Sequence, residues 1–138
     1  MIITAKSTSG TVIFGRKVAK KLHGGEILAL IGHLGSGKTS FAKGVAAGLG
    51  VRRLVPSPTF TLMNLYPIRR QGLRYLCHID AYRLKAGHEL EEVGAHEFLG
   101  RPDTVCVIEW ADKLKATLRH FTRSEYRFTA KNLRTRTI

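Results

Sequence analysis

The feature that most constrains this chain is a glycine-rich segment of eight residues, GHLGSGKT, at positions 32–39. It fits the phosphate-loop pattern G-x-x-x-x-G-K-[ST], in which each fixed position has a chemical role on a nucleotide triphosphate. Glycines let the backbone wrap closely around phosphate oxygens, so that successive N–H groups point at the anion. Lys38 is expected to bring a positive charge to the β- and γ-phosphates, and the Thr39 hydroxyl is expected to ligate Mg²⁺. The segment therefore predicts a nucleotide-binding site.

The residues on either side of this loop supply the setting that the pattern requires. Residues 26–31 form a short apolar run between glycines, which is typical of a buried parallel strand. Downstream, Phe41, Val45 and Leu49 recur four residues apart and form one stripe of a helix. A helix N-terminus that follows the loop adds the attraction of the helix dipole for phosphate.

The rest of the chain predicts one α/β domain over residues 1–138, because this length leaves room for a single core. Further elements are expected as an edge strand at 2–6, a helix capped by Ser9 or Thr11, an antiparallel hairpin of 60–66 and 73–79, a weak helix at 87–99, a buried strand at 104–108, a short helix at 112–118 and a peripheral strand at 126–130. The expected fold is a three-layer P-loop NTPase with a mostly parallel central sheet and antiparallel additions.

The charge of the chain is high and unevenly distributed. Its formal net charge is +13, yet residues 80–112 hold eight acidic and only three basic residues. Residues 113–138 hold eight basic residues against Glu125 alone. Such a field favours polyanions, with tRNA as the obvious class, although a solvated basic surface that keeps the protein soluble explains it equally well.

The sequence does not predict a membrane protein or a secreted protein. No apolar run approaches the roughly 20 residues of a membrane span, and the first residues lack the layout of a signal peptide. Cys77 and Cys106 fall within expected strands and do not form a CxxC pair. We therefore expect two buried thiols in a reducing, cytoplasmic environment.

A phosphate loop needs acidic partners at the carboxyl ends of neighbouring strands, and two carboxylates occupy such positions. Glu109 follows the apolar run 105–108, and Asp80 follows the apolar run 76–79. One is expected to hold Mg²⁺ or its water, and the other to orient or deprotonate the attacking water. Taken singly, each is also explained as a surface acid or an ion-pair partner.

Several neighbouring residues have two interpretations. Thr59 lies where switch segments sense the γ-phosphate through a hydroxyl, but an ST-turn at a strand start explains it equally well. His78, Tyr82 and Arg83 flank Asp80 and are expected to orient it or to bind a partner, with covering of the core as the alternative for Tyr82. Trp110 is expected to be a packing residue. Because the chain contains neither an Asn-Lys-x-Asp motif nor an Asp-x-x-Gly switch, ATP is favoured over GTP.

Four motifs in this order resemble the TsaE family, the small ATPases of tRNA threonylcarbamoyladenosine synthesis. They are GHLGSGKT at 32–39, SPTFTL at 57–62, HIDAYRL at 78–84 and VIEW at 107–110. The likeness spans about residues 10–112. The phosphate loop alone indicates only a superfamily, whereas the other three motifs together are far more specific.

The resemblance implies an ATPase that does not itself modify tRNA. It implies docking on a TsaB–TsaD pair that transfers threonylcarbamoyl to an adenosine beside the anticodon, with ATP hydrolysis supporting turnover. Carried over by motif, Thr39 and Glu109 serve Mg²⁺, Asp80 is the catalytic or switch carboxylate and Thr59 is the switch hydroxyl. The residues expected to bind the nucleotide are Thr11, Gly35, Ser36, Gly37, Lys38, Thr39 and Ser40.

The sequence departs from the family pattern at His33, where an acidic residue is usual, so the loop entrance is less negative here. We therefore predict a Mg²⁺-dependent ATPase. Because no motif supplies an arginine that would stabilise the transition state, we expect a partner to stimulate its turnover. Two alternatives remain open: a small-molecule or nucleoside kinase with the same loop, and a nucleotide-gated RNA-binding module with negligible catalysis.

Overall fold

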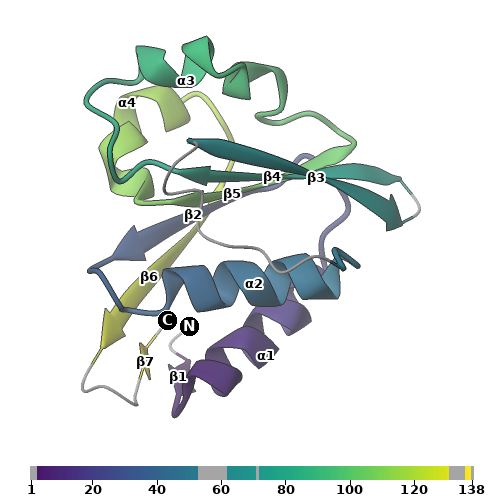
Figure 1. Ribbon diagram of the computed structural model, residues 1–138, viewed down its shortest axis with the longest axis vertical. Coiled ribbons are helices and arrows are strands. Elements are labelled where there is room, and N and C mark those ends of the chain that lie inside the picture. The colour runs from purple at the N-terminus through teal and green to yellow at the C-terminus, as the bar shows by residue number, and fades with distance from the viewer. Residues whose placement is uncertain (1–2, 53–61, 71, 131–135, 138) are drawn as a thin grey trace.

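The computed structural model describes residues 3–52, 62–70, 72–130 and 136–137 (Figure 1). The strands of the described residues are β1 (Thr4–Ala5), β2 (Ile27–Gly32), β3 (Met63–Arg70), β4 (Leu73–Asp80), β5 (Thr104–Glu109), β6 (Ser124–Ala130) and β7 (Arg136–Thr137). The helices are α1 (Thr8–Ala19), α2 (Lys38–Gly48), α3 (His88–Glu92) and α4 (Lys115–Leu118), with 3₁₀ turns η1 (Ala95–Glu97) and η2 (Ala111–Leu114). Figure 1 shows α1 and α2 on one face of the sheet and α3 and α4 on the other, which confirms the predicted three layers.

The sheet has the order β1-β7-β6-β2-β5-β4-β3, and its centre is parallel. Strands β6, β2, β5 and β4 pair in parallel, while β3, β7 and β1 add antiparallel pairs outside them. The expected hairpin is β3–β4. The expectation of a peripheral strand near residue 126 was wrong, because β6 lies between β2 and β7. The phosphate loop therefore leaves the sheet from β2, a central strand.

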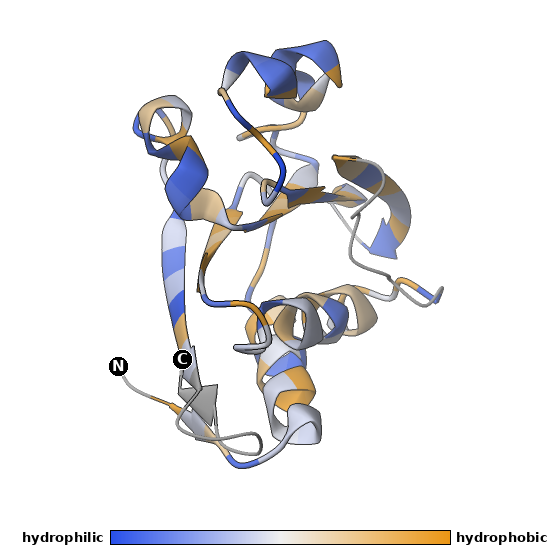
Figure 2. Cartoon of the chain, turned by 60° about the vertical axis from the view of Figure 1, so that its left-hand side comes forward, coloured by the Kyte–Doolittle hydropathy of each residue, from blue (hydrophilic) through white to orange (hydrophobic). Residues whose placement is uncertain are grey.

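Side chains of β5 alternate between two buried clusters, as the two-residue period of a strand requires. Val105 and Val107 pack in the cluster formed with α1 and α2, whereas Cys106 and Ile108 pack in the cluster formed with α3 and α4. Glu109 comes two residues after Val107 and so lies on the face that carries α2. Hydrophobic residues run along these central strands (Figure 2), as expected for a sheet covered on both faces.

Strand β4 follows the same alternation beside β5. Leu76 packs toward α1 and α2, so His78 and Asp80 share its face of the sheet. The parallel register pairs His78 with Val107 and Asp80 with Glu109. Two adjacent strands thus end in polar side chains on the face that carries α2, where the phosphate loop begins.

Helices α1 and α2 pack against each other through glycines. A Cβ atom on Gly44 would lie 2.1 Å from the carbonyl oxygen of Val12, and one on Gly15 would lie 2.4 Å from that of Phe41. Both distances are shorter than any real contact, so only hydrogen at these positions permits this backbone approach. The close packing brings the beginning of α1 next to the beginning of α2.

The cap of α1 differs from the expectation. Ser7 is the N-cap, and its side chain accepts a hydrogen bond from the backbone N–H of Gly10, at 3.0 Å. Ser9 and Thr11 lie inside the helix instead. Thr11 is fully buried, and its hydroxyl donates to the Ser7 carbonyl oxygen at 3.4 Å.

Both cysteines are free and buried, as predicted. They face each other in the β4–β5 register, within the cluster formed with α3 and α4. The hydrogen bond with Cys77, together with burial, raises the pKa of the Cys106 thiol. The Cys106 thiol is therefore a protonated core group with little nucleophilic character.

Candidate functional site

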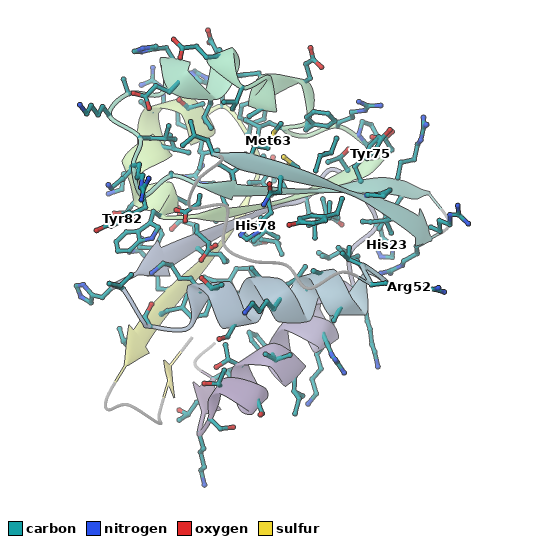
Figure 3. The ribbon with its side chains drawn as sticks, viewed as in Figure 1. His23, Arg52, Met63, Tyr75, His78 and Tyr82 are labelled. Atoms are coloured by element: carbon teal, nitrogen blue, oxygen red, sulfur yellow. The ribbon has the colours of Figure 1, made fainter. Side chains whose placement is uncertain are left out.

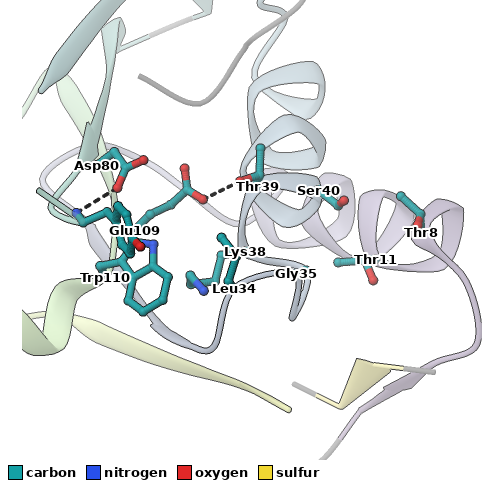
Figure 4. A pocket seen from close by; sticks show the side chains of 12 residues that line it. Thr8, Thr11, Leu34, Gly35, Lys38, Thr39, Ser40, Asp80, Glu109 and Trp110 are labelled. Atoms are coloured by element: carbon teal, nitrogen blue, oxygen red, sulfur yellow. Dashed lines mark hydrogen bonds between the residues drawn. The ribbon is translucent and has the colours of Figure 1, made fainter. Parts of the chain in front are cut away.

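The phosphate loop forms the connection from β2 to α2, as the sequence predicts. Gly35 and Gly37 both have left-handed backbone conformations, with φ of 73° and 112°, which glycine adopts without a steric penalty. A cavity of about 310 Å³ opens beside the loop (Figure 4). Its lining consists of Thr8, Thr11, Leu34, Gly35, Gly37, Lys38, Thr39, Ser40, Asp80, Tyr82, Glu109 and Trp110.

Most of the predicted nucleotide-binding residues line this cavity. Ser36 does not, because it is buried beneath the loop with its hydroxyl 3.3 Å from the Lys38 ammonium. Thr11 lines the cavity from α1, and its role in nucleotide binding stays a prediction. Thr59, the expected switch hydroxyl, lies outside the described residues.

Lys38 is held by the loop itself. Its Nζ atom donates to the carbonyl oxygens of Gly32, at 2.5 Å, and His33, at 2.7 Å. The same ammonium lies 4.0 Å from the centre of the Trp110 ring, in a cation–π contact (Figure 4). Burial lowers the pKa of Lys38 from its ordinary value, although the carboxylates of Glu109, Asp112 and Asp80 oppose this effect.

Glu109 is joined to both neighbouring elements by short hydrogen bonds. The Thr39 hydroxyl of α2 donates to its Oε1 at 2.6 Å, and the His78 Nε2 of β4 lies 2.7 Å from its Oε2. Burial works to raise the pKa of Glu109, but the hydrogen bonds from His78 and Thr39 and the charge of Lys38 outweigh it. The pKa is therefore lowered, and Glu109 is ionised at neutral pH.

Asp80 ends β4 directly beside Glu109, and both carboxylates face the cavity. Its Oδ1 accepts a hydrogen bond from the backbone N–H of Tyr82 at 2.9 Å, which fixes one side of the carboxylate. The expectation that both acids meet at the carboxyl ends of neighbouring strands is thus confirmed in position. The expectation that His78 orients Asp80 was wrong, since the imidazole contacts Glu109 instead.

The donor set suits a hard divalent cation such as Mg²⁺. Thr39 offers a hydroxyl oxygen, and Glu109 and Asp80 offer carboxylate oxygens in the same cavity. Among the described residues, no cluster of three or more His, Cys, Asp or Glu side chains has the arrangement of a metal site. An all-protein cage is therefore not expected here, and Mg²⁺ at phosphate sites typically needs only one or two protein oxygens besides phosphate and water.

The sequence reasoning missed the aromatic wall of this cavity. Trp110 was expected to pack in the core, and its ring does contact the cluster formed with α3 and α4, but it also lines the cavity over Lys38. Its backbone is left-handed, with φ 59° and ψ 38°, which turns the chain out of β5 toward η2. Tyr82 packs on the indole with ring centres 4.9 Å apart, and Lys113 lies 5.0 Å from the Tyr82 ring. The position of Trp110 directly after a strand-ending carboxylate was the available signal.

Fold and site together define a protein of the P-loop NTPase class: a central parallel strand, a glycine loop, a helix that begins at the loop lysine, and carboxylates on the adjacent strands. The chain belongs to the TsaE family. The family model described as "Threonylcarbamoyl adenosine biosynthesis protein TsaE" matches residues 5–138. The match also covers the basic C-terminal region, which the four motifs do not reach.

Comparisons with individual proteins agree with this assignment. The chain is 37% identical over 122 residues to "tRNA threonylcarbamoyladenosine biosynthesis protein TsaE" of Treponema pallidum, which is 88% of this chain and 87% of that protein. It is 42% identical over 99 residues to the protein of the same name from Streptomyces coelicolor, which is 71% of this chain and 65% of that protein. The crystal structure of Bacillus subtilis YdiB superposes with a TM-score of 0.73 at 27% identity, covering 99% of this chain and 81% of that one.

Proposed function

We propose that this protein binds and hydrolyses ATP with Mg²⁺ as an accessory protein of tRNA threonylcarbamoyladenosine biosynthesis. The observation that carries the proposal is that Lys38 and Thr39 of the phosphate loop share one cavity with Glu109 and Asp80 of two adjacent strands. The names of the relatives support the pathway. Within the described residues, no helix has the length and apolar character needed to cross a bilayer. A place in the cytoplasm, where tRNA is modified, is part of the proposal.

The loop residues bind the phosphates. The backbone N–H groups from Gly35 to Thr39 surround the β-phosphate, and Lys38 exchanges its bonds to the Gly32 and His33 carbonyls for bonds to phosphate oxygens. Thr39 and Glu109 would hold the metal, which would supply positive charge against the phosphates.

Asp80 orients the attacking water. The water oxygen forms a bond to the γ-phosphorus as the bond from phosphorus to the β–γ bridging oxygen breaks, and the water proton passes to Asp80 or to the released phosphate. The backbone N–H of Tyr82 holds the Asp80 carboxylate in place for this role. The indole of Trp110 excludes water from one side of Lys38, which strengthens the electrostatic attraction for phosphate. Thr59 is the switch hydroxyl in this proposal.

Turnover of the isolated protein is slow in this proposal. None of the twelve described residues that line the cavity is an arginine, and a transition-state arginine is worth several orders of magnitude in rate. A TsaB–TsaD type transferase pair is the partner that completes the site. Exposed Lys113, Lys115 and Arg119 on η2 and α4 form a basic surface for tRNA.

The test is phosphate release from MgATP by the isolated protein, by the protein with its partner pair, and by the pair with tRNA. We expect little phosphate alone and a large stimulation by the pair. Transfer of the γ-phosphate to a small molecule instead of water would establish the kinase alternative. Nucleotide-dependent tRNA binding without phosphate release in any mixture would establish the RNA-binding alternative.

A further inference from the structure

The histidine of the HIDAYRL motif is not explained by the proposed mechanism. His78 lies on β4, on the face of the sheet that carries α2 (Figure 3). Only 1% of its surface is exposed. Its Nε2 is 2.7 Å from Glu109 Oε2. An ionised carboxylate only accepts hydrogen bonds, so the imidazole donates from Nε2 whether it is neutral or charged.

The other ring nitrogen shows that this histidine is poorly suited to a purely structural role. His78 Nδ1 is buried, and it has no hydrogen-bond partner in the part of the chain that the structure describes. Burying an unpaired polar atom costs free energy, and an apolar side chain of similar volume in the same position would avoid that cost. Packing alone therefore favours leucine or methionine over histidine, so the bond to Glu109 is what requires the imidazole.

The bond fixes the Glu109 carboxylate from a second side. Thr39 holds Oε1 from the first turn of α2, and His78 holds Oε2 from β4. The last side-chain torsion of glutamate is broad, so a single hydrogen bond at Oε1 does little to set its angle. With bonds to both oxygens, the plane of the carboxylate is set at the wall of the cavity.

We propose that His78 is a positioning residue for Mg²⁺–nucleotide binding, holding the Glu109 carboxylate so that it meets the metal or its water beside Thr39. The inference rests on the proposed function and deepens it. It differs from the motif-based expectation, in which His78 serves Asp80. Partners that orient metal-binding carboxylates typically change metal affinity by about 10- to 100-fold when they are removed.

Three substitutions separate the hydrogen bond from packing. In His78→Gln, the side-chain amide nitrogen reaches the place of Nε2 and can still donate to Glu109. In His78→Asn, the amide ends near the place of Nδ1 and cannot reach. His78→Leu removes all polar atoms and keeps the core filled.

The first measurement uses the nucleotide-free protein. NMR of ¹⁵N-histidine-labelled wild-type protein should show a slowly exchanging, downfield Nε2–H signal for His78, and Glu109→Gln should shift it. A His78 Nε2 without a bound proton, or a signal that Glu109→Gln leaves unchanged, would overturn the inference before any ligand is added.

The second measurement is Mn²⁺ binding in the presence of saturating ADP, followed by electron paramagnetic resonance on folded protein, with thermal unfolding as the check on folding. We expect His78→Leu and His78→Asn to weaken Mn²⁺ binding by roughly 10- to 100-fold. His78→Gln keeps the donor, so its loss of Mn²⁺ affinity should be smaller than this. ADP affinity without metal should be equal in all four proteins.

Equal Mn²⁺ affinity in the wild type and all three variants would overturn the inference about His78 and leave the proposed function standing. Equal losses in all three variants, Gln included, would also overturn it, because the donor at the Nε2 position would then have no effect. A wild-type protein that shows the NMR signal yet binds no metal–nucleotide complex would contradict the proposed function and the inference with it.

Discussion

Replacing Lys38 by alanine is the most direct test of the phosphate loop. In the free protein, the Lys38 ammonium makes two hydrogen bonds to backbone carbonyls, of Gly32 and His33, and contacts the Trp110 ring. In the proposed function, charged phosphate oxygens replace those carbonyl oxygens around Lys38 when a nucleotide binds. Lys38 therefore contributes to the binding free energy only the difference between its bonds to phosphate and its bonds to the carbonyls. Lys38→Ala removes that difference.

That difference sets the expected magnitude. Both sets of bonds involve the charged ammonium, but a phosphate oxygen adds an opposite charge, which we take as worth about 1–1.5 kcal/mol per bond. Exchanging two carbonyl bonds for two phosphate bonds then favours binding by about 2–3 kcal/mol. This corresponds to an ATP affinity about 30- to 150-fold weaker in Lys38→Ala.

The assay is calorimetric titration with a non-hydrolysable ATP analogue and Mg²⁺. Lys43→Ala is the matched control, because Lys43 lies on the same helix and is not among the residues that line the cavity. We expect Lys43→Ala to bind as the wild type does. Unchanged affinity in a folded Lys38→Ala protein would show that the loop does not bind the phosphates.

Lys38→Ala should also change how the free energy of unfolding depends on pH. Burial lowers the pKa of Lys38 in the folded protein, so the unfolded chain holds this proton more tightly. The free energy of unfolding of the wild type therefore gains a component as pH rises from the lowered pKa toward 10.5, the ordinary value of the group. Lys38→Ala should lack this component, and urea unfolding across alkaline pH measures it. A pH dependence identical in the two proteins would contradict burial of the charged ammonium.

Three further predictions concern the carboxylates, the helix pair and the partners. Glu109→Gln should raise the Mg²⁺ concentration needed for phosphate release by at least about tenfold. Asp80→Asn should reduce turnover and leave ATP affinity largely unchanged. Equal effects of the two substitutions on Mg²⁺ dependence and turnover would refute the division of roles. Gly44→Ala should destabilise the fold by about 1–3 kcal/mol because its Cβ meets the Val12 backbone, while Gly10→Ala, where a Cβ has ordinary contacts, should stabilise it by about 0.5–1 kcal/mol; denaturant titration compares them. The partner pair should stimulate phosphate release strongly at low salt and less at high salt, and Thr59→Ala should reduce this stimulation more than ATP binding; fast, partner-independent release would contradict an accessory role.

The sequence predicted the site where local pattern and strand period were sufficient. The phosphate-loop pattern placed Lys38 and Thr39 at the start of a helix, as found. Asp80 and Glu109 were assigned from their positions after apolar runs, and the parallel register of β4 and β5 does bring them side by side. The carboxyl ends of parallel strands all lie at the same edge of the sheet. Knowing that the strands are parallel was therefore enough to place the two carboxylates near each other.

The predictions failed where the outcome depends on contacts across the sheet or on a choice between equivalent local signals. His78 is two residues from Asp80 in the sequence, but the cross-strand neighbour Glu109 takes its hydrogen bond. Strand β6 looked peripheral because polar and apolar residues alternate along it, but the two-residue strand β7 pairs with its outer edge. Ser7 and Ser9 are both good cap residues, and only the packing of α1 distinguishes them.

The described site has a protein partner for each of its central charges before any nucleotide binds. Lys38 is held by loop carbonyls, Glu109 by Thr39 and His78, and Asp80 by the backbone of Tyr82. In the proposed function, nucleotide binding exchanges bonds at Lys38, while Glu109 and Asp80 are already held by protein groups. Such preorganisation lowers the cost of reaching the transition state, but it adds no cation at the γ-phosphate beyond Lys38 and the metal. Among the described residues that line the cavity, Lys38 is the one cation, and this observation supports the proposal that a partner supplies the further cation needed for fast turnover.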